Sequence, residues 1–153
     1  MPAAIRHATS ADAEETAAVF SAAFRSMRFV PKMHSDEEDR AFIAGLIAGK
    51  ECWVAEREGR VLGLACLHQG WLEQLYVDPA HHNNGIGTLL LQRAMREHPE
   101  GFQFWTFQAN EGARRFYERH GCVAVEFTDG SGNEERTPDV RYEWRPATTP
   151  RTA

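Results

Sequence analysis

The sequence predicts a mixed α/β fold, because segments of helical and of strand-like periodicity alternate along its 153 residues. Two capping-box sequences, beginning at Thr9 and at Ser35, each precede apolar residues at helical spacing. Between residues 52 and 77, apolar runs are separated by glycine-containing turns, which indicates antiparallel strands. We expect one domain over residues 1–145 and a flexible C-terminal tail over 146–153.

The first half of the chain should contain two helices and four strands. The first helix carries Ala13, Ala17, Phe20 and Phe24 on one face, and the second begins after Ser35 and ends near residue 49. The expected strands cover residues 4–8, 52–56, 61–68 and 72–77, with a hairpin turn at 58–60.

The second half should alternate helices and strands before it closes with a hairpin. We expect helices over 85–97 and 110–120, and strands over 102–107, 123–127 and 140–144. Four tryptophans, Trp53, Trp71, Trp105 and Trp144, fall in strands or at their edges. Large rings at such positions usually pack under helices, so we expect all four in the core.

The segment WLEQLYVDPAHHNNGIGTLLL, residues 71–91, joins an apolar strand to an apolar helix through a turn that contains Gly85 and Gly87. Backbone N–H groups in the first turn of a helix lack partners and lie at the positive end of the helix dipole, which suits a phosphate. The turn fits neither a dinucleotide fingerprint, whose third glycine would replace Leu90, nor a P-loop, because no Lys-Ser/Thr pair follows. Alone it remains weak evidence for a ligand.

A second motif, NEGARRFYERHGC at residues 110–122, predicts a helix capped by Asn110 and ended by Gly121. Together with LYVDPAHHNNGIGTLLLQ, it resembles the acyl-CoA site of the GNAT superfamily of N-acetyltransferases. The resemblance implies a mixed, mostly antiparallel, twisted sheet of about seven strands flanked by about four helices. It also implies that two neighbouring parallel strands, 72–77 and 102–107, splay apart to form the acyl-CoA cleft.

The resemblance implies that acetyl-CoA is the acyl-donor cosubstrate. The pantetheine arm would bond to the strand backbone at Leu75, Tyr76 and Val77, while Asn110 and Tyr117 would approach it from the next helix. The pyrophosphate would rest on the loop made of His82, Asn83, Asn84, Gly85, Ile86, Gly87 and Thr88. His82 and Asn83 depart from the family pattern, which usually has Gln or Arg first and often Gly second.

The implied reaction is direct attack of a primary amine on the thioester within a ternary complex. By resemblance, Tyr117 would protonate the leaving thiol, and Glu73 would act as a carboxylate base or hold a water molecule. Ordinary structural roles remain open: a helix cap for Asn110, a core tyrosine for Tyr117 and a surface ion pair for Glu73. A non-catalytic acyl-CoA-binding domain is the alternative of a different class.

The acceptor is the least defined partner. Glu134 and Glu135 belong to an acidic segment, residues 126–139, which in relatives borders the acceptor pocket and would suit a cationic amine. Phe29, in the apolar segment 24–33, would line the opposite wall. Both segments also fit plain solvated or packed roles. The acceptor is either a small molecule or a peptide, and an enzyme for protein N-termini or lysines would need an open groove.

Composition excludes several partner classes. The 17 basic and 22 acidic residues give a net charge of −5, which disfavours nucleic acid and anionic lipid. No leader or apolar span is evident, so a cytoplasmic protein is expected. Three widely spaced cysteines and the adjacent His81 and His82 do not form a metal motif, so we expect no metal and buried, inert thiols. The resemblance also allows a homodimer.

Overall fold

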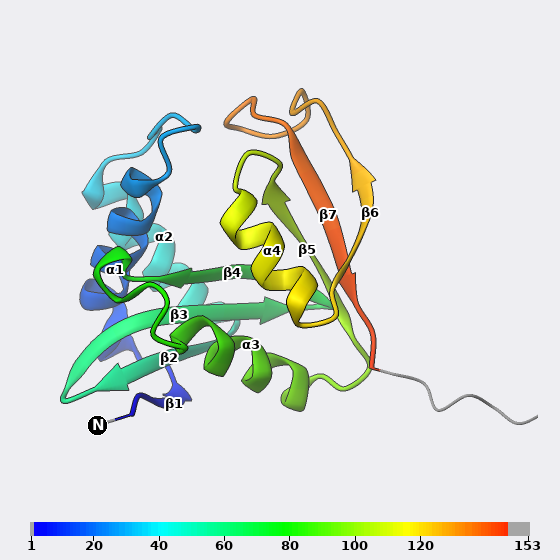
Figure 1. The fold of residues 1–153 in the computed structure, drawn as a ribbon. Coiled ribbons are helices and arrows are strands. Elements are labelled where there is room, and N and C mark those ends of the chain that lie inside the picture. The colour runs from blue at the N-terminus through cyan, green and yellow to red at the C-terminus, as the bar shows by residue number, and fades with distance from the viewer. Residues whose placement is uncertain (1, 147–153) are drawn as a thin grey trace, which may run out of the picture.

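A computed structural model describes residues 2–146, and it confirms the mixed α/β fold (Figure 1). Seven strands form one sheet in the order β1-β2-β3-β4-β5-β7-β6. The strands are β1 (Ala4–His7), β2 (Glu51–Arg57), β3 (Arg60–His68), β4 (Trp71–Val77), β5 (Phe102–Phe107), β6 (Val123–Phe127) and β7 (Asp139–Trp144). The α-helices are α1 (Ala13–Ser26), α2 (Asp36–Gly49), α3 (Ile86–Glu97) and α4 (Glu111–Arg119). Residues 147–153 of the expected tail lie outside the described part.

Both predicted capping boxes form. At the start of α2, Glu38 N donates to Ser35 Oγ at 3.1 Å, and Ser35 N donates to Glu38 Oε1 at 2.9 Å. Before α1, the box of Thr9 and Asp12 opens a short 3₁₀ turn, and the α-helix follows from Ala13. These caps satisfy backbone N–H groups that the first turn of a helix leaves without partners.

The sheet separates two apolar cores, and helices cover each face. α1 and α2 lie on one face, and α3 and α4 lie on the other (Figure 1). Side chains alternate between the faces along each strand, so Val54 and Leu64 pack with α1 and α2, whereas Trp53 and Ala65 pack with α3. The helices α1 and α2 therefore cover the N-terminal part of the sheet, namely β2, β3 and β4.

The expectation that all four tryptophans lie in the core is wrong for Trp105, which is 43% exposed. Trp71 is only partly buried and belongs to neither apolar core. On β5, Phe104 faces the core below α4, and period-two alternation turns Trp105 to the opposite face. That face is covered by α1 and α2 over the N-terminal strands but not at β5. Trp53, in contrast, is fully buried.

The predicted splay between β4 and β5 is confirmed. The two parallel strands pair only at Trp71 opposite Gln103, and Gln103 N donates to Gly70 O at 2.9 Å. β4 remains paired with β3 up to Val77, and β5 remains paired with β7 along its length. One backbone edge of β4 is therefore left without a neighbouring strand beyond Trp71.

All three cysteines, Cys52, Cys66 and Cys122, are free and buried. Cys52 and Cys66 stand opposite each other on β2 and β3, with sulfur atoms 2.6 Å apart. No helix within residues 2–146 combines the length and the apolar character needed to cross a lipid bilayer.

Candidate active site

A cleft of about 1790 Å³ opens where β4 and β5 diverge, and it reaches from the start of α3 to the connection between α1 and α2. Most of the predicted site residues line it. They are Glu73, Leu75, Tyr76, Val77, His82, Asn83, Gly85, Ile86, Gly87, Thr88, Asn110, Tyr117, Glu134 and Glu135. Asn84 and Phe29 are not among its lining residues. Pockets for one small ligand measure about 300–1,000 Å³, so this cleft has room for two reactants.

Six consecutive backbone amides, Asn83 through Thr88, donate to no acceptor within residues 2–146. The first bond of the helix is Leu89 N to Gly85 O, at 3.1 Å. Asn83 and Gly85 both have left-handed backbones, with φ of 67° and 79°. Unpaired amides at the positive end of a helix dipole form an anion site, which suits a diphosphate.

The two glycines of this turn serve different purposes. A side chain at Gly85 would meet no atom within 4 Å, but its φ of +79° is strained for any residue with a Cβ. A Cβ at Gly87 would instead approach Phe116 Cζ at 3.3 Å, because α4 packs against the start of α3. Gly85 therefore shapes the loop, and Gly87 allows the close approach of α4.

Two histidines form hydrogen bonds that connect this loop and the start of α3 to neighbouring elements. His120 Nδ1 donates to Phe116 O at 2.8 Å, so its Nε2 accepts from Thr88 Oγ1 at 3.3 Å. This contact joins the end of α4 to the first turn of α3. His82 Nε2 donates to Val77 O at 3.2 Å, which ties the loop back to the end of β4. The His82 side chain thus has a local partner of its own.

Glu73 occupies a β-bulge on β4. Cys66 pairs with Gln74 and Leu67 pairs with Leu72, so Glu73 is the extra residue. Its carboxylate lines the cleft and accepts a hydrogen bond from Lys50 Nζ in an ion pair, with the Glu73 side chain 28% exposed. Sequence analysis left such an ion pair open as an alternative role, and the structure contains it.

Tyr117 and Tyr76 approach the cleft from opposite sides. Tyr117 packs on Phe104 with ring centroids 4.4 Å apart, and it is only 7% exposed. Burial, reinforced by the nearby Tyr76 hydroxyl, raises the pKa of Tyr117 above the ordinary value for a phenol. Its hydroxyl bonds to none of the described residues. Tyr117 therefore stays protonated at neutral pH, with its hydroxyl free for a ligand.

Asn110 caps α4, as predicted. Its Oδ1 accepts from Ala113 N at 3.1 Å, while its Nδ2 points to Met27 Sδ at 3.8 Å. Only the weak contact with sulfur engages the amide nitrogen. The capping role and a role in binding are therefore compatible, because they use different atoms.

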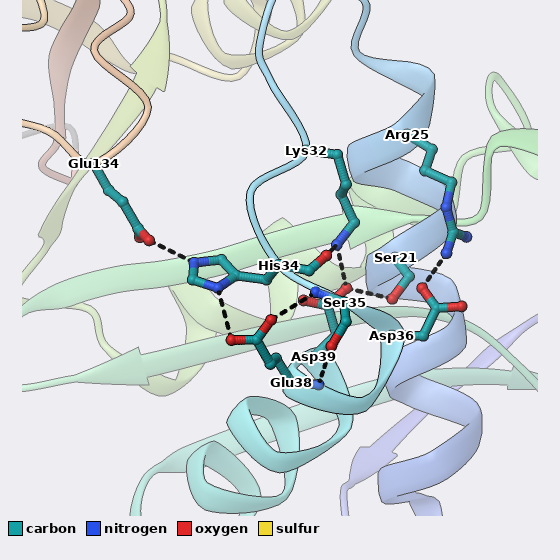
Figure 2. Close-up of polar contacts among 9 residues, drawn as sticks. All are labelled: Ser21, Arg25, Lys32, His34, Ser35, Asp36, Glu38, Asp39 and Glu134. Atoms are coloured by element: carbon teal, nitrogen blue, oxygen red, sulfur yellow. Dashed lines mark hydrogen bonds and ion pairs between the residues drawn. The ribbon is translucent and has the colours of Figure 1, made fainter.

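The other end of the cleft is bounded by the connection between α1 and α2, residues 27–35, which we call the strap, and by the β6–β7 loop. His34 of the strap meets Glu134 of the loop, with Nε2 and Oε1 2.5 Å apart (Figure 2). Glu135 also lines the cleft, and it makes no ion pair within residues 2–146. Burial and, to a smaller extent, the charge of Glu135 raise the pKa of Tyr76, which lines the same cleft.

Several lining residues were missed by sequence analysis. Arg115 and Arg119, one turn apart on α4, line the same cleft as the unpaired amides, and neither has an ion-pair partner in the described part of the chain. Their i, i+4 spacing next to a phosphate loop was a usable signal. His34 and Lys32 also line the cleft, but nothing local in the sequence brings them to it.

No group of three or more His, Cys, Asp or Glu side chains within residues 2–146 is arranged to hold a metal ion. The adjacent His81 and His82 point to different partners, Arg57 and Val77.

The chain is similar in sequence to known proteins. A family model described as the acetyltransferase (GNAT) family matches residues 16–122. The chain is 32% identical over 81 residues to the peptidyl-lysine N-acetyltransferase YiaC of Escherichia coli K12, covering 52% of this chain and 55% of that protein. The chain thus spans about half the length of the curated relatives it matches.

Solved structures share the whole fold at lower identity. The apo form of YjaB from Escherichia coli superposes with a TM-score of 0.78 at 21% identity, covering 96% of this chain and 100% of that one. yncA from Salmonella typhimurium, solved with acetyl-CoA, has a TM-score of 0.74 at 20% identity over the full length of both chains.

Proposed function

The chain belongs to the GNAT acetyltransferase family, and from this premise we propose that it is an N-acetyltransferase that uses acetyl-CoA. The proposed reaction moves the acetyl group to a primary amine by direct attack in a ternary complex. We call the end of the cleft at residues 83–88 the donor end, and the end at the strap the acceptor end. This assignment makes the protein an acyltransferase.

One observation carries the proposal: the same cleft is bordered by an unpaired β4 edge and by the run of six unpaired amides, five of which belong to residues that line the cleft. An extended pantetheine arm can bond to the strand edge as an added strand would, and a diphosphate can accept from the amides. The chemical character of these groups therefore fits acetyl-CoA. Leu75, Tyr76 and Val77 would hold the arm, and the loop from His82 to Thr88 would hold the diphosphate.

The cosubstrate would supply an activated thioester, whose C–S bond breaks as a new N–C bond forms. Tyr117 Oη is protonated and free of bonds to the described residues, so it would donate the proton that the departing sulfur needs. The nitrogen loses two protons as it passes from ammonium to amide. Glu73 would take one of them, directly or through water, and the other would restore the Tyr117 hydroxyl. Lys50 would keep that carboxylate in place at the bulge of β4.

The proposed acceptor is a primary amine that carries a positive charge. The other lining acids have partners within the described residues. Glu134 and Glu38 pair with His34, Asp39 pairs with Lys32 and Glu73 pairs with Lys50, while Asp139 accepts from Thr128 and Asn133. Glu135 makes no ion pair within the described residues, and it lines the same cleft as Tyr76. A lysine within a protein is the second candidate, because a relative bears the name of a peptidyl-lysine acetyltransferase.

Release of free thiol from acetyl-CoA, measured with and without a panel of primary amines, tests the proposal. A binding-only domain would take up acetyl-CoA but release no thiol when amines are added. The variant Glu73→Gln should flatten the acidic limb of the pH–rate profile, because it removes the proposed proton acceptor. Glu97→Gln, the same change in a pair on α3 outside the cleft, should leave the profile intact. An identical profile for Glu73→Gln would exclude Glu73 as the base.

A further inference from the structure

The strap crosses the open end of the splay and touches three elements of the C-terminal half. Met27 contacts Asn110 at the start of α4, at 3.8 Å. Phe29 packs edge-on against Phe107, the last residue of β5, with ring centroids 6.1 Å apart. His34 reaches Glu134, 100 residues further along the chain, at 2.5 Å. Strand pairing joins β4 and β5 only at Trp71 and Gln103, so the strap forms a second crossing at the opposite end.

The strap is firmly anchored to the N-terminal half. Lys32 Nζ donates to Asp39 Oδ2 at 2.8 Å, and Ser21 Oγ donates to the same oxygen at 2.5 Å (Figure 2). Asp39 is 3% exposed, so this bonding satisfies a buried carboxylate whose partners would be costly to remove. Lys32 also donates to the His34 carbonyl oxygen, which fixes the backbone just before α2.

The tip of the strap is held more lightly. The His34 and Glu134 side chains are 44% and 54% exposed, and exposed ion pairs contribute little to stability. Glu38 of α2 faces the other ring nitrogen, with Nδ1 and Oε2 3.6 Å apart. The strap is therefore held firmly where Lys32 bonds to Asp39, whereas its tip at His34 can separate from the β6–β7 loop.

We propose that the strap, closed onto the β6–β7 loop by His34 and Glu134, restricts the acceptor to small amines. A lysine in an extended polypeptide is then excluded unless the pair separates. This inference rests on the proposed function and names the substrate class of its acceptor end. His34 and Glu134 act as specificity-determining residues, not as catalytic ones, because Tyr117 and Glu73 carry the proposed proton transfers.

Steric room is the physical basis of this selection. Neighbouring strands need about 4.8 Å within a sheet, and layers of side chains need about 10 Å. A bonded contact of 2.5 Å between the strap and the loop leaves no passage for a polypeptide at that point. A small amine needs no passage between them, because its chain does not continue on both sides of the reacting nitrogen.

The test compares two acceptors in a thiol-release assay: butane-1,4-diamine and a twelve-residue peptide with blocked ends and one central lysine. Wild type, His34→Ala and Glu134→Gln are assayed. Breaking the pair should raise the ratio of kcat/KM for peptide over diamine by about three- to fivefold, as expected for an exposed pair. Glu100→Gln, which removes a carboxylate paired with His98 outside the cleft, is the matched control and should not alter the ratio.

An NMR titration of His34 tests the contact itself. Glu134, with a smaller contribution from Glu38, raises the pKa of His34, so its resonance should titrate at lower pH in Glu134→Gln. Identical titrations in the two proteins would overturn the proposal, as would thiol release at an unchanged acceptor ratio. Absence of thiol release from both probes in every variant would instead overturn the proposed function, and the acceptor selection would fall with it.

Discussion

The donor end of the cleft is one continuous piece of backbone, whereas the acceptor end is assembled from side chains up to 100 residues apart. At the donor end, six consecutive amides are unpaired within the described residues, and Asn83 and Gly85 of this run have left-handed backbones. At the acceptor end, the strap meets the β6–β7 loop only because the two halves of the sheet hold them side by side (Figure 1). Backbone geometry therefore defines one end, and tertiary packing defines the other.

This difference has a functional meaning. Amides do not titrate and lose little freedom on binding, so the donor end suits a cosubstrate that never changes. The exposed pair of His34 with Glu134 at the acceptor end responds to pH and to substitution. The acceptor end is thus the part of this molecule in which selectivity can change without loss of the fold.

Tyr117 lies where the two ends meet, and its substitution should have the largest effect. Tyr117→Phe should lower kcat by about 10²-fold, because the proposed proton donor is lost. Acetyl-CoA affinity should stay within about twofold, since the ring packing on Phe104 is kept. Steady-state kinetics and calorimetry measure the two quantities.

Tyr142→Phe is the matched control, because the Tyr142 hydroxyl bonds to Glu118 at 2.6 Å and does not line the cleft. It should leave kcat nearly unchanged. If Tyr117→Phe keeps full kcat at neutral pH, Tyr117 is not the proton donor of the reaction.

The donor end should be more sensitive than the acceptor end to a change in backbone conformation. Gly85→Val places a β-branched residue at a φ of +79°, a strain of about 1–3 kcal/mol that the loop can relieve only by moving its amides. The Kd for acetyl-CoA should rise about tenfold, as measured by calorimetry. Gly59→Val, at a φ of +77° and with the same open space around it, should cost similar stability without changing Kd. Equal affinities in both variants would show that the turn does not bind the diphosphate.

The smallest expected effect is a difference in pH dependence between the acceptor end and the donor end of the cleft. Glu134 and Glu38 face His34, and Lys32 donates to the His34 carbonyl oxygen; together the two acids raise the pKa of His34. The charged pair is therefore complete below the ordinary histidine pKa of about 6.5 and is lost as pH rises through the raised value.

From pH 6 to pH 9, the peptide-to-diamine ratio should rise about twofold in wild type and stay flat in Glu134→Gln. Acetyl-CoA affinity should vary less, because the amides that hold the diphosphate do not titrate. A ratio that rises equally in both proteins would assign the effect to another group.

Features that depend on local sequence signals were predicted well. The glycine turn, the Asn110 cap and the capping box at Ser35 all formed, because each depends on dihedrals and hydrogen bonds within a few residues. The splay was predicted by family resemblance rather than by local pattern. The roles of Tyr117 and Glu73 remain predictions.

Contacts across the molecule could not be predicted in this way. The exposure of Trp105 depends on which half of the sheet α1 and α2 cover, and the Lys50–Glu73 pair depends on a bulge in β4. Phe29 was expected to line the acceptor wall, but it packs against Phe107 instead. Each outcome depends on contacts between segments that are distant in the sequence, which no short sequence motif encodes.

Titration of the ¹⁵N-labelled protein with acetyl-CoA, followed by amide resonances, tests the central claim most directly. If the donor end binds the cosubstrate, the amides of residues 83–88 should show the largest shifts, together with those of the β4 edge at residues 75–77. Saturating acetyl-CoA that leaves these amides unmoved, or that shifts a different surface, would contradict the account.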